Sequence, residues 1–165
     1  MNQQVILLNG PSSSGKSSMS KSLQKLISDK GHENYEVISI DDFMKISTKE
    51  KIYEDDVFEI SEDICKCALK SLEKGCGVII DHVITSERIF NQLTENLSFY
   101  PIRTVHVTCP LEILKRRELL RGDRCIGSAE SSFEYLFPKE GYDLVIDSSK
   151  NSSDENAELI LNMFF

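Results

Sequence analysis

The chain has 165 residues, of which 40% are hydrophobic and 28% charged, and its formal net charge at pH 7 is -8. These values fit one globular domain over residues 1–165 and exclude a largely disordered chain. The acidic balance disfavours nucleic acid and anionic membranes as partners, although a local pocket can still bind a small anion.

The N-terminal residues and the cysteines together predict a cytoplasmic protein. The start of the chain lacks the positive charge and long apolar core of a signal peptide. No stretch approaches the ~20 apolar residues of a membrane span. The five cysteines are irregularly spaced, which favours reduced thiols over disulfides or a metal–thiolate site.

Short apolar runs alternate along the chain with segments of helical periodicity. The runs are rich in β-branched residues and bounded by polar or glycine residues, as buried strands are. They are Val5–Leu8, Val37–Ile40, Val78–Ile80, Val105–Val107 and Leu144–Ile146. Helical segments are expected around 19–27, 60–72, 85–96, 111–120 and 157–164. This alternation predicts an α/β fold in three layers, a five-stranded parallel sheet between helices.

Two long polar segments interrupt this pattern. They run from Phe43 to Val57 and from Arg121 to Gly141. Long loops in a compact domain are often functional, so we expect an acceptor-side segment at about 42–60 and a lid at about 121–141. The alternative is that both are surface connections without a role in the site.

Residues 10–17 carry the strongest motif in the chain. They match the phosphate-binding pattern G-x-x-x-x-G-K-[ST] and lie between a predicted strand and a predicted helix, as a P-loop requires. Backbone N–H groups and the helix N-terminus would bind the phosphates of ATP. Lys16 is expected to bridge the terminal phosphates, and the Ser17 hydroxyl to ligate Mg²⁺. The predicted nucleotide-binding residues are Gly10, Pro11, Ser12, Ser13, Ser14, Gly15, Lys16, Ser17 and Ser18. A serine- and glycine-rich connecting turn is the alternative.

Aspartates follow two of the predicted strands. Asp41 and Asp42 come after Ile40, and Asp81 comes after Ile80. The carboxyl ends of parallel strands meet at one sheet edge, beside the P-loop. We predict that Asp41 accepts a proton from a substrate hydroxyl and that Asp81 holds Mg²⁺, directly or through water. Alternatively, each caps the segment that follows it.

A basic cluster runs from Lys115 to Arg124 in this otherwise acidic chain. Arg117 and Arg121 are four residues apart and therefore share a helical face. Arg121 and Arg124 flank Gly122-Asp123. This arrangement suits a lid that closes over phosphates, because one guanidinium group can donate two hydrogen bonds to phosphate oxygens. Surface ion pairs on a solvated helix are the alternative.

Several of these stretches resemble the chloramphenicol phosphotransferase-like proteins. They are residues 7–17, Cys109-Pro110-Leu111-Glu112, Arg117-Glu118 with Arg121-Gly122-Asp123-Arg124, and Tyr142-Asp143 before Val145-Ile146-Asp147. The resemblance implies a fold like that of nucleotide and shikimate kinases and ATP-dependent phosphorylation of an antibiotic hydroxyl. It also implies Asp41 as the base and Arg121 and Arg124 as lid arginines. Two departures concern the acceptor: Phe137 stands where the family often has histidine, and the segment between Asp41 and Asp81 is shorter.

The main hypothesis is therefore a small-molecule kinase in which Lys16, Asp41, Arg121 and Arg124 are catalytic, with ATP and Mg²⁺ as cofactors. The alternatives are a nucleotide or metabolite kinase and a non-catalytic ATP-binding module. The partner would be a small-molecule hydroxyl acceptor, and the sequence leaves homo-oligomerisation open.

Overall fold

A computed structural model describes residues 3–44 and 52–165. Its strands form one parallel sheet in the order β2-β3-β1-β4-β5. They are β1 (Val5–Asn9), β2 (Tyr35–Ser39), β3 (Gly77–His82), β4 (Ile102–Thr108) and β5 (Leu144–Asp147). The strand order reverses beside β1, so the chain following β1 emerges at the topological switch point, where α/β folds bind ligands.

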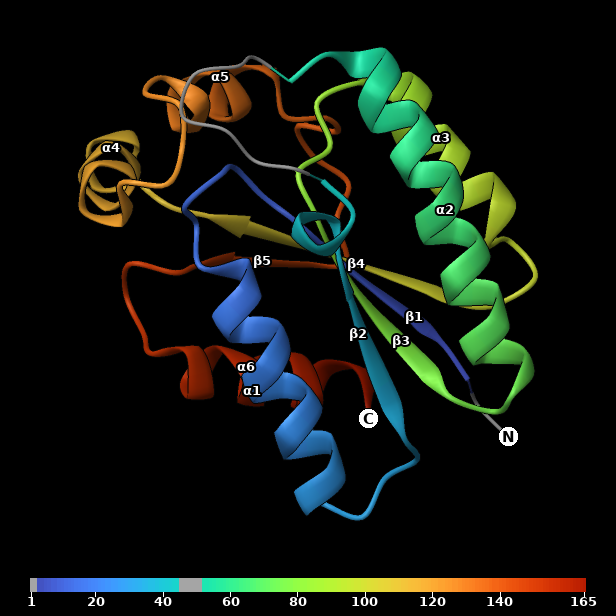
Figure 1. The fold of residues 1–165 in the computed structure, drawn as a ribbon. Coiled ribbons are helices and arrows are strands. Elements are labelled where there is room, and N and C mark those ends of the chain that lie inside the picture. The colour runs from blue at the N-terminus through green and yellow to red at the C-terminus, as the bar shows by residue number, and fades with distance from the viewer. Residues whose placement is uncertain (1–2, 45–51) are drawn as a thin grey trace.

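Helices cover both faces of the sheet (Figure 1). On one face, α1 (Lys16–Asp29) packs against α6 (Ser153–Phe164). On the other, α2 (Glu54–Glu73) packs against α3 (Glu87–Asn96). Two further helices, α4 (Leu111–Arg121) and α5 (Ser128–Tyr135), lie beyond the carboxyl ends of the strands. The α/β, three-layer P-loop fold predicted from the sequence is thus confirmed.

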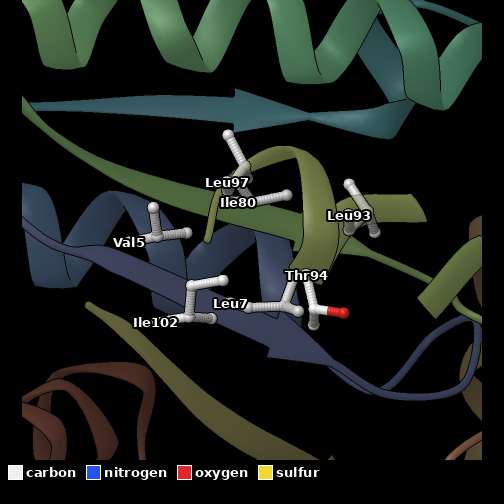
Figure 2. Close-up of a pocket in the computed structure, with 7 residues that line it drawn as sticks. All are labelled: Val5, Leu7, Ile80, Leu93, Thr94, Leu97 and Ile102. Atoms are coloured by element: carbon white, nitrogen blue, oxygen red, sulfur yellow. The ribbon is translucent and has the colours of Figure 1, made fainter. Parts of the chain in front are cut away.

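The two faces of the sheet pack against their helices in separate apolar cores. Alternate residues of β1 point to opposite faces, so Val5 and Leu7 join the α2–α3 core while Ile6 and Leu8 join the α1–α6 core. Figure 2 shows the contact between α3 and the sheet, where a small space has no room for a water molecule. Its lining residues are Val5, Leu7, Ile80, Leu93, Thr94, Leu97 and Ile102. This space is part of the apolar packing and cannot hold a ligand.

All five strands differ from the predicted runs by one or more residues at an end, and three boundaries bear on the site. The second strand ends at Ser39 and not at Ile40, because the Ser39 hydroxyl accepts the N–H of Asp41 and starts a short 3-10 helix, η1 (Ile40–Asp42). Helix α3 begins two residues after the predicted Thr85, because the Ser86 side chain caps it. Helix α2 begins at Glu54, so part of the predicted acceptor-side segment is helical.

The predicted lid is also not a continuous loop. Helix α5 occupies residues 128–135 inside the 121–141 segment. The sequence pattern had missed this helix. Among the described residues, no helix combines the length and apolarity needed to cross a membrane.

Candidate functional site

The P-loop connects the end of β1 to the start of α1 in a tightly defined shape. Ser13 and Gly15 have left-handed backbones, with φ values of 70° and 93°. Such turns gather successive N–H groups into an anion-binding nest. Gly10 lies so close to β4 that a Cβ atom there would be 2.2 Å from the carbonyl oxygen of Val107. Helix α1 starts without a side-chain cap, so its first N–H groups can bind an anion. The loop therefore fits a chain of phosphates.

The Lys16 side chain lies within this loop and is only 5% exposed. Its Nζ donates to the carbonyl oxygens of Gly10 and Pro11, both at 2.9 Å, and to Ser14 Oγ at 3.3 Å. Burial lowers the pKa of Lys16, and the nearby carboxylates of Asp81 and Asp41 oppose this effect in part. All three hydrogen-bond acceptors are neutral, so an anionic phosphate would stabilise the charged ammonium group.

Asp81 joins the P-loop helix to the neighbouring strand. It is 3% exposed, and its Oδ2 accepts hydrogen bonds from Ser17 Oγ at 2.8 Å and Ser39 Oγ at 3.1 Å. Such oxygen donors suit Mg²⁺, which takes one or two protein ligands and completes its shell with phosphate and water. No group of three or more His, Cys, Asp or Glu side chains within residues 3–44 and 52–165 is arranged to hold a metal. Mg²⁺ bound here would need nucleotide oxygens.

Asp41 lies in η1, just past the end of β2, and both it and the adjacent Asp42 are exposed. The carboxylate of Asp41 accepts a hydrogen bond from Arg124 Nη2 at 3.0 Å. The structure therefore brings the predicted base into direct contact with a predicted lid arginine, although the two residues are 83 positions apart.

The two lid arginines differ in their surroundings. The Arg124 side chain is 11% exposed and pairs with Asp123 as well as Asp41, both at 3.0 Å. Arg121 is the last residue of α4, and its Nε lies 3.2 Å from Asp123 Oδ1. Two parts of the lid are irregular: residues 136–141 after α5, and the short stretch between Gly122 and Gly127, which have φ values of 69° and 99°. Arg124 therefore sits on a short loop between two glycines in left-handed conformations.

Helix α5 is attached to α4 and to the P-loop. The buried carboxylate of Glu118 accepts the N–H groups of Gly127 at 3.2 Å and Ala129 at 2.8 Å, which caps the start of α5. Further along α5, Ser132 Oγ accepts the N–H of Ser12 at 2.9 Å. Sequence reasoning assigned no role to Glu118 or Ser132. The glycine before Ser128-Ala129-Glu130 was the available signal for a helix start.

Asn9, the last residue of β1, connects two loops at the same sheet edge, the one after β3 and the one before β5. Its Oδ1 accepts the N–H of Ile84 at 2.8 Å, and its Nδ2 donates to the Phe137 carbonyl and the Tyr142 hydroxyl, both at 2.9 Å. Phe137 N–H in turn donates to the Ile84 carbonyl at 2.9 Å, and its ring contacts that of Phe90 edge-on at 5.9 Å. A single polar residue after an apolar run gave no sequence signal for this role.

His82 is fully buried beside Asp81 and was not singled out from the sequence. Its Nε2 lies 2.9 Å from the Ser61 hydroxyl of α2. Burial lowers the pKa of His82 to about 4, and the nearby Lys16 charge acts in the same direction. The imidazole is therefore neutral at physiological pH and links β3 to α2.

The chain is similar to known proteins in sequence pattern and in fold. The family described as "Chloramphenicol phosphotransferase-like protein" matches residues 3–164. No curated protein sequence matches the chain.

Three solved structures illustrate the similarity in fold. The APS kinase CysC of Mycobacterium tuberculosis, in complex with AMPPNP and APS, has a TM-score of 0.80 at 19% identity, over 98% of this chain and 97% of that one. A gluconokinase from Sinorhizobium meliloti has a TM-score of 0.73 at 17% identity, over 97% and 90%. The tunicamycin resistance protein of Deinococcus radiodurans has 0.68 at 16%, over 98% and 95%. At these identities the comparison establishes the fold of P-loop kinases.

Proposed function

We propose that this chain, which belongs to the chloramphenicol phosphotransferase-like protein family over residues 3–164, is a kinase that transfers the γ-phosphate of ATP to a hydroxyl group of a small molecule. One observation carries this proposal. The phosphate-binding loop, the Ser17–Asp81 oxygen pair and the Asp41–Arg124 pair all lie at the carboxyl edge of the sheet. Phosphoryl transfer needs these parts together: a phosphate cradle, oxygen ligands for Mg²⁺, a base and a mobile cation.

Residues 10–18 would hold the phosphates of ATP, with Lys16 at the terminal ones. Ser17 and Asp81 would hold Mg²⁺, which neutralises charge on the phosphate oxygens when bound. The hydrogen bond between Ser17 and Asp81, at 2.8 Å, already brings their oxygens together on the side of the P-loop helix. This arrangement supports nucleotide binding beside the P-loop.

Asp41 would take the proton of the acceptor hydroxyl. As that proton moves to the carboxylate, the hydroxyl oxygen bonds to the γ-phosphorus, and the bond from this phosphorus to the oxygen bridging to the β-phosphate breaks, leaving ADP. Arg121 and Arg124 would stabilise the charge that develops on the transferred group. Arg124 is paired with Asp41 at 3.0 Å, so moving Arg124 to the phosphates would free Asp41 for the acceptor.

The acceptor side favours a molecule without phosphate groups. Arg88 on α3 lies 2.9 Å from Asp55 and 3.5 Å from Glu54, so its charge is already compensated. The three lysines of the acceptor-side segment, Lys45, Lys49 and Lys51, lie outside the described residues. Phe137 presents an apolar ring where the family often has histidine, which supports a small hydroxylated acceptor that can differ from chloramphenicol.

The test is a screen for ATP consumption against hydroxylated antibiotics, nucleosides and sugars, with product mass as the readout. Once an acceptor is found, Asp41→Asn should lower its phosphorylation by a factor on the order of 10²–10⁴, with the lower end favoured by a loose transition state. ATP affinity should change only a few-fold. Asp42→Asn is the matched control and should have little effect. If no acceptor is phosphorylated and Asp41→Asn changes nothing, the chain is an ATP-binding module and not a kinase.

A further inference from the structure

We propose that Arg117 is a positioning residue that holds the P-loop in its phosphate-binding shape through the backbone of Ser13, without touching the nucleotide. The proposal rests on nucleotide binding at the P-loop, which is one part of the proposed function. It does not depend on which acceptor is used or on whether one is used at all.

The P-loop contains a turn whose conformation Ser13 does not favour. Ser14 N–H donates to the Pro11 carbonyl at 3.2 Å, which closes a four-residue turn with Ser13 in its third position. The φ value of Ser13 is 70°, a conformation that glycine and asparagine adopt far more readily than serine. The Ser13 hydroxyl is buried without a hydrogen-bond partner in the described part of the chain. The Ser13 side chain therefore adds no hydrogen bond to this turn, so a contact from outside the loop can help to hold it.

Arg117 makes that contact. Its Nη1 donates to the Ser13 carbonyl at 3.3 Å and to Ser148 Oγ at 3.1 Å, while Nη2 lies 3.4 Å from the Ser148 carbonyl. Ser148 is itself fixed, since its N–H donates to the Thr108 carbonyl at the end of β4 at 2.9 Å. The planar guanidinium group thus joins the P-loop to a rigid point of the sheet edge. Nη1 also lies against Gly15, at 3.9 Å from where a Cβ atom would be.

The next residue of α4 reaches the P-loop by a second route. Glu118 caps α5, and Ser132 of α5 accepts the N–H of Ser12. Adjacent residues of α4 therefore hold adjacent residues of the loop, Arg117 directly and Glu118 through α5. This closed circuit of hydrogen bonds holds the loop at two adjacent residues, Ser12 and Ser13. Without Arg117, the Ser13–Ser14 peptide could relax toward a right-handed backbone, and the nest would lose its shape.

The proposal predicts which ligands lose affinity. A deformed nest weakens binding of any ligand with a phosphate chain, whether or not a nucleoside is attached. Calorimetry with the magnesium complexes of pyrophosphate, ADP and ATP should therefore show the same loss for all three on Arg117→Ala, on the order of tenfold each, as expected for one charge-assisted hydrogen bond. Arg117→Lys should restore little, because one ammonium group cannot bridge Ser13 and Ser148. Amide exchange across residues 13–15 should also become faster in the ligand-free variant.

The exposed Arg116 provides a charge-matched control, and Arg116→Ala should bind all three ligands as the wild type does. If Arg117→Ala weakens ADP and ATP but leaves pyrophosphate unchanged, the side chain contacts the nucleoside and the proposal is wrong. If ATP alone is weakened, the contact is with the γ-phosphate and the proposal is equally wrong. Unchanged affinities for all three also overturn it. If Arg117→Ala does not fold, Arg117→Gln, which removes the charge at similar length, takes its place. A wild type that binds none of the three would refute the nucleotide site itself, and with it the proposed function.

Discussion

The buried His82 leads to a quantitative prediction that needs no knowledge of the substrate. Its pKa is about 4 in the folded protein and 6.5 as an ordinary histidine. The unfolded chain therefore binds more protons than the folded chain between these two values, and stability must fall as the pH decreases through this window. Above pH 7 both states hold the imidazole neutral, and the contribution is constant.

The size of the effect follows from the two pKa values. At pH 5 an imidazole with a pKa of 6.5 is about 97% protonated, while one with a pKa of about 4 is about 10% protonated. This difference lowers the free energy of unfolding by about 2 kcal/mol relative to pH 7.5. Typical domains are stable by about 5–15 kcal/mol, so the loss should be easily measured.

The assay is urea denaturation of wild type and His82→Gln at pH 7.5 and pH 5. Glutamine can offer its amide to Ser61, which now contacts His82 Nε2, but it does not titrate. The variant should lose about 2 kcal/mol less than wild type between the two pH values, whatever its stability at pH 7.5. His32→Gln removes an exposed histidine and should follow the wild-type profile. Equal losses in wild type and His82→Gln would show that burial of His82 does not shape the acid sensitivity of the fold.

Three further changes test the site. Lys16→Ala should reduce ATP affinity clearly in calorimetry, because it removes a charge from the phosphates, while the thermal midpoint stays close to wild type; unchanged affinity would refute the P-loop assignment. Arg124→Ala and Arg121→Ala should each lower kcat more than ATP affinity in steady-state assays, since their charge acts mostly in the transition state. Normal turnover in both variants would mean that these residues only form surface ion pairs. Gly10→Ala places a Cβ atom 2.2 Å from the Val107 carbonyl and should destabilise the fold by about 1–3 kcal/mol in urea denaturation; no loss would mean that this close approach is not required.

The fold and the phosphate site could be predicted because their signals are local. A buried parallel strand is a short apolar run, and all five runs became strands of one sheet. The P-loop motif specifies a turn, a lysine and a helix start within eight residues, and the structure places Lys16 and Ser17 at the start of α1 accordingly. Asp81 was located in the same way, since it lies near the carboxyl end of β3, although this strand runs to His82, past the predicted end at Ile80.

The lid could not be predicted in detail because its order depends on contacts from distant residues. Helix α5 is short, and its sequence has little apolar periodicity of its own. Two contacts from outside the helix hold it in place. The buried carboxylate of Glu118 accepts the N–H of Ala129 at the start of α5, and the Ser132 hydroxyl within α5 accepts the N–H of Ser12. Neither partner can be recognised from the residues of α5, so the whole 121–141 segment looked like a loop.

The P-loop is held in shape by residues far away in the sequence. The bonds that shape the P-loop join Ser12 to Ser132, 120 positions away, and Ser13 to Arg117, 104 positions away. Asn9, which immediately precedes the loop, bonds to Phe137 at a separation of 128. We therefore expect substitutions in α4, α5 or the segment before β5 to affect the P-loop through its backbone, even where their side chains would contact no ligand. Ser132→Ala makes the point, because it removes no group from the site. It leaves the partly buried N–H of Ser12 without its acceptor, a loss that costs about 1 kcal/mol at the base of the P-loop.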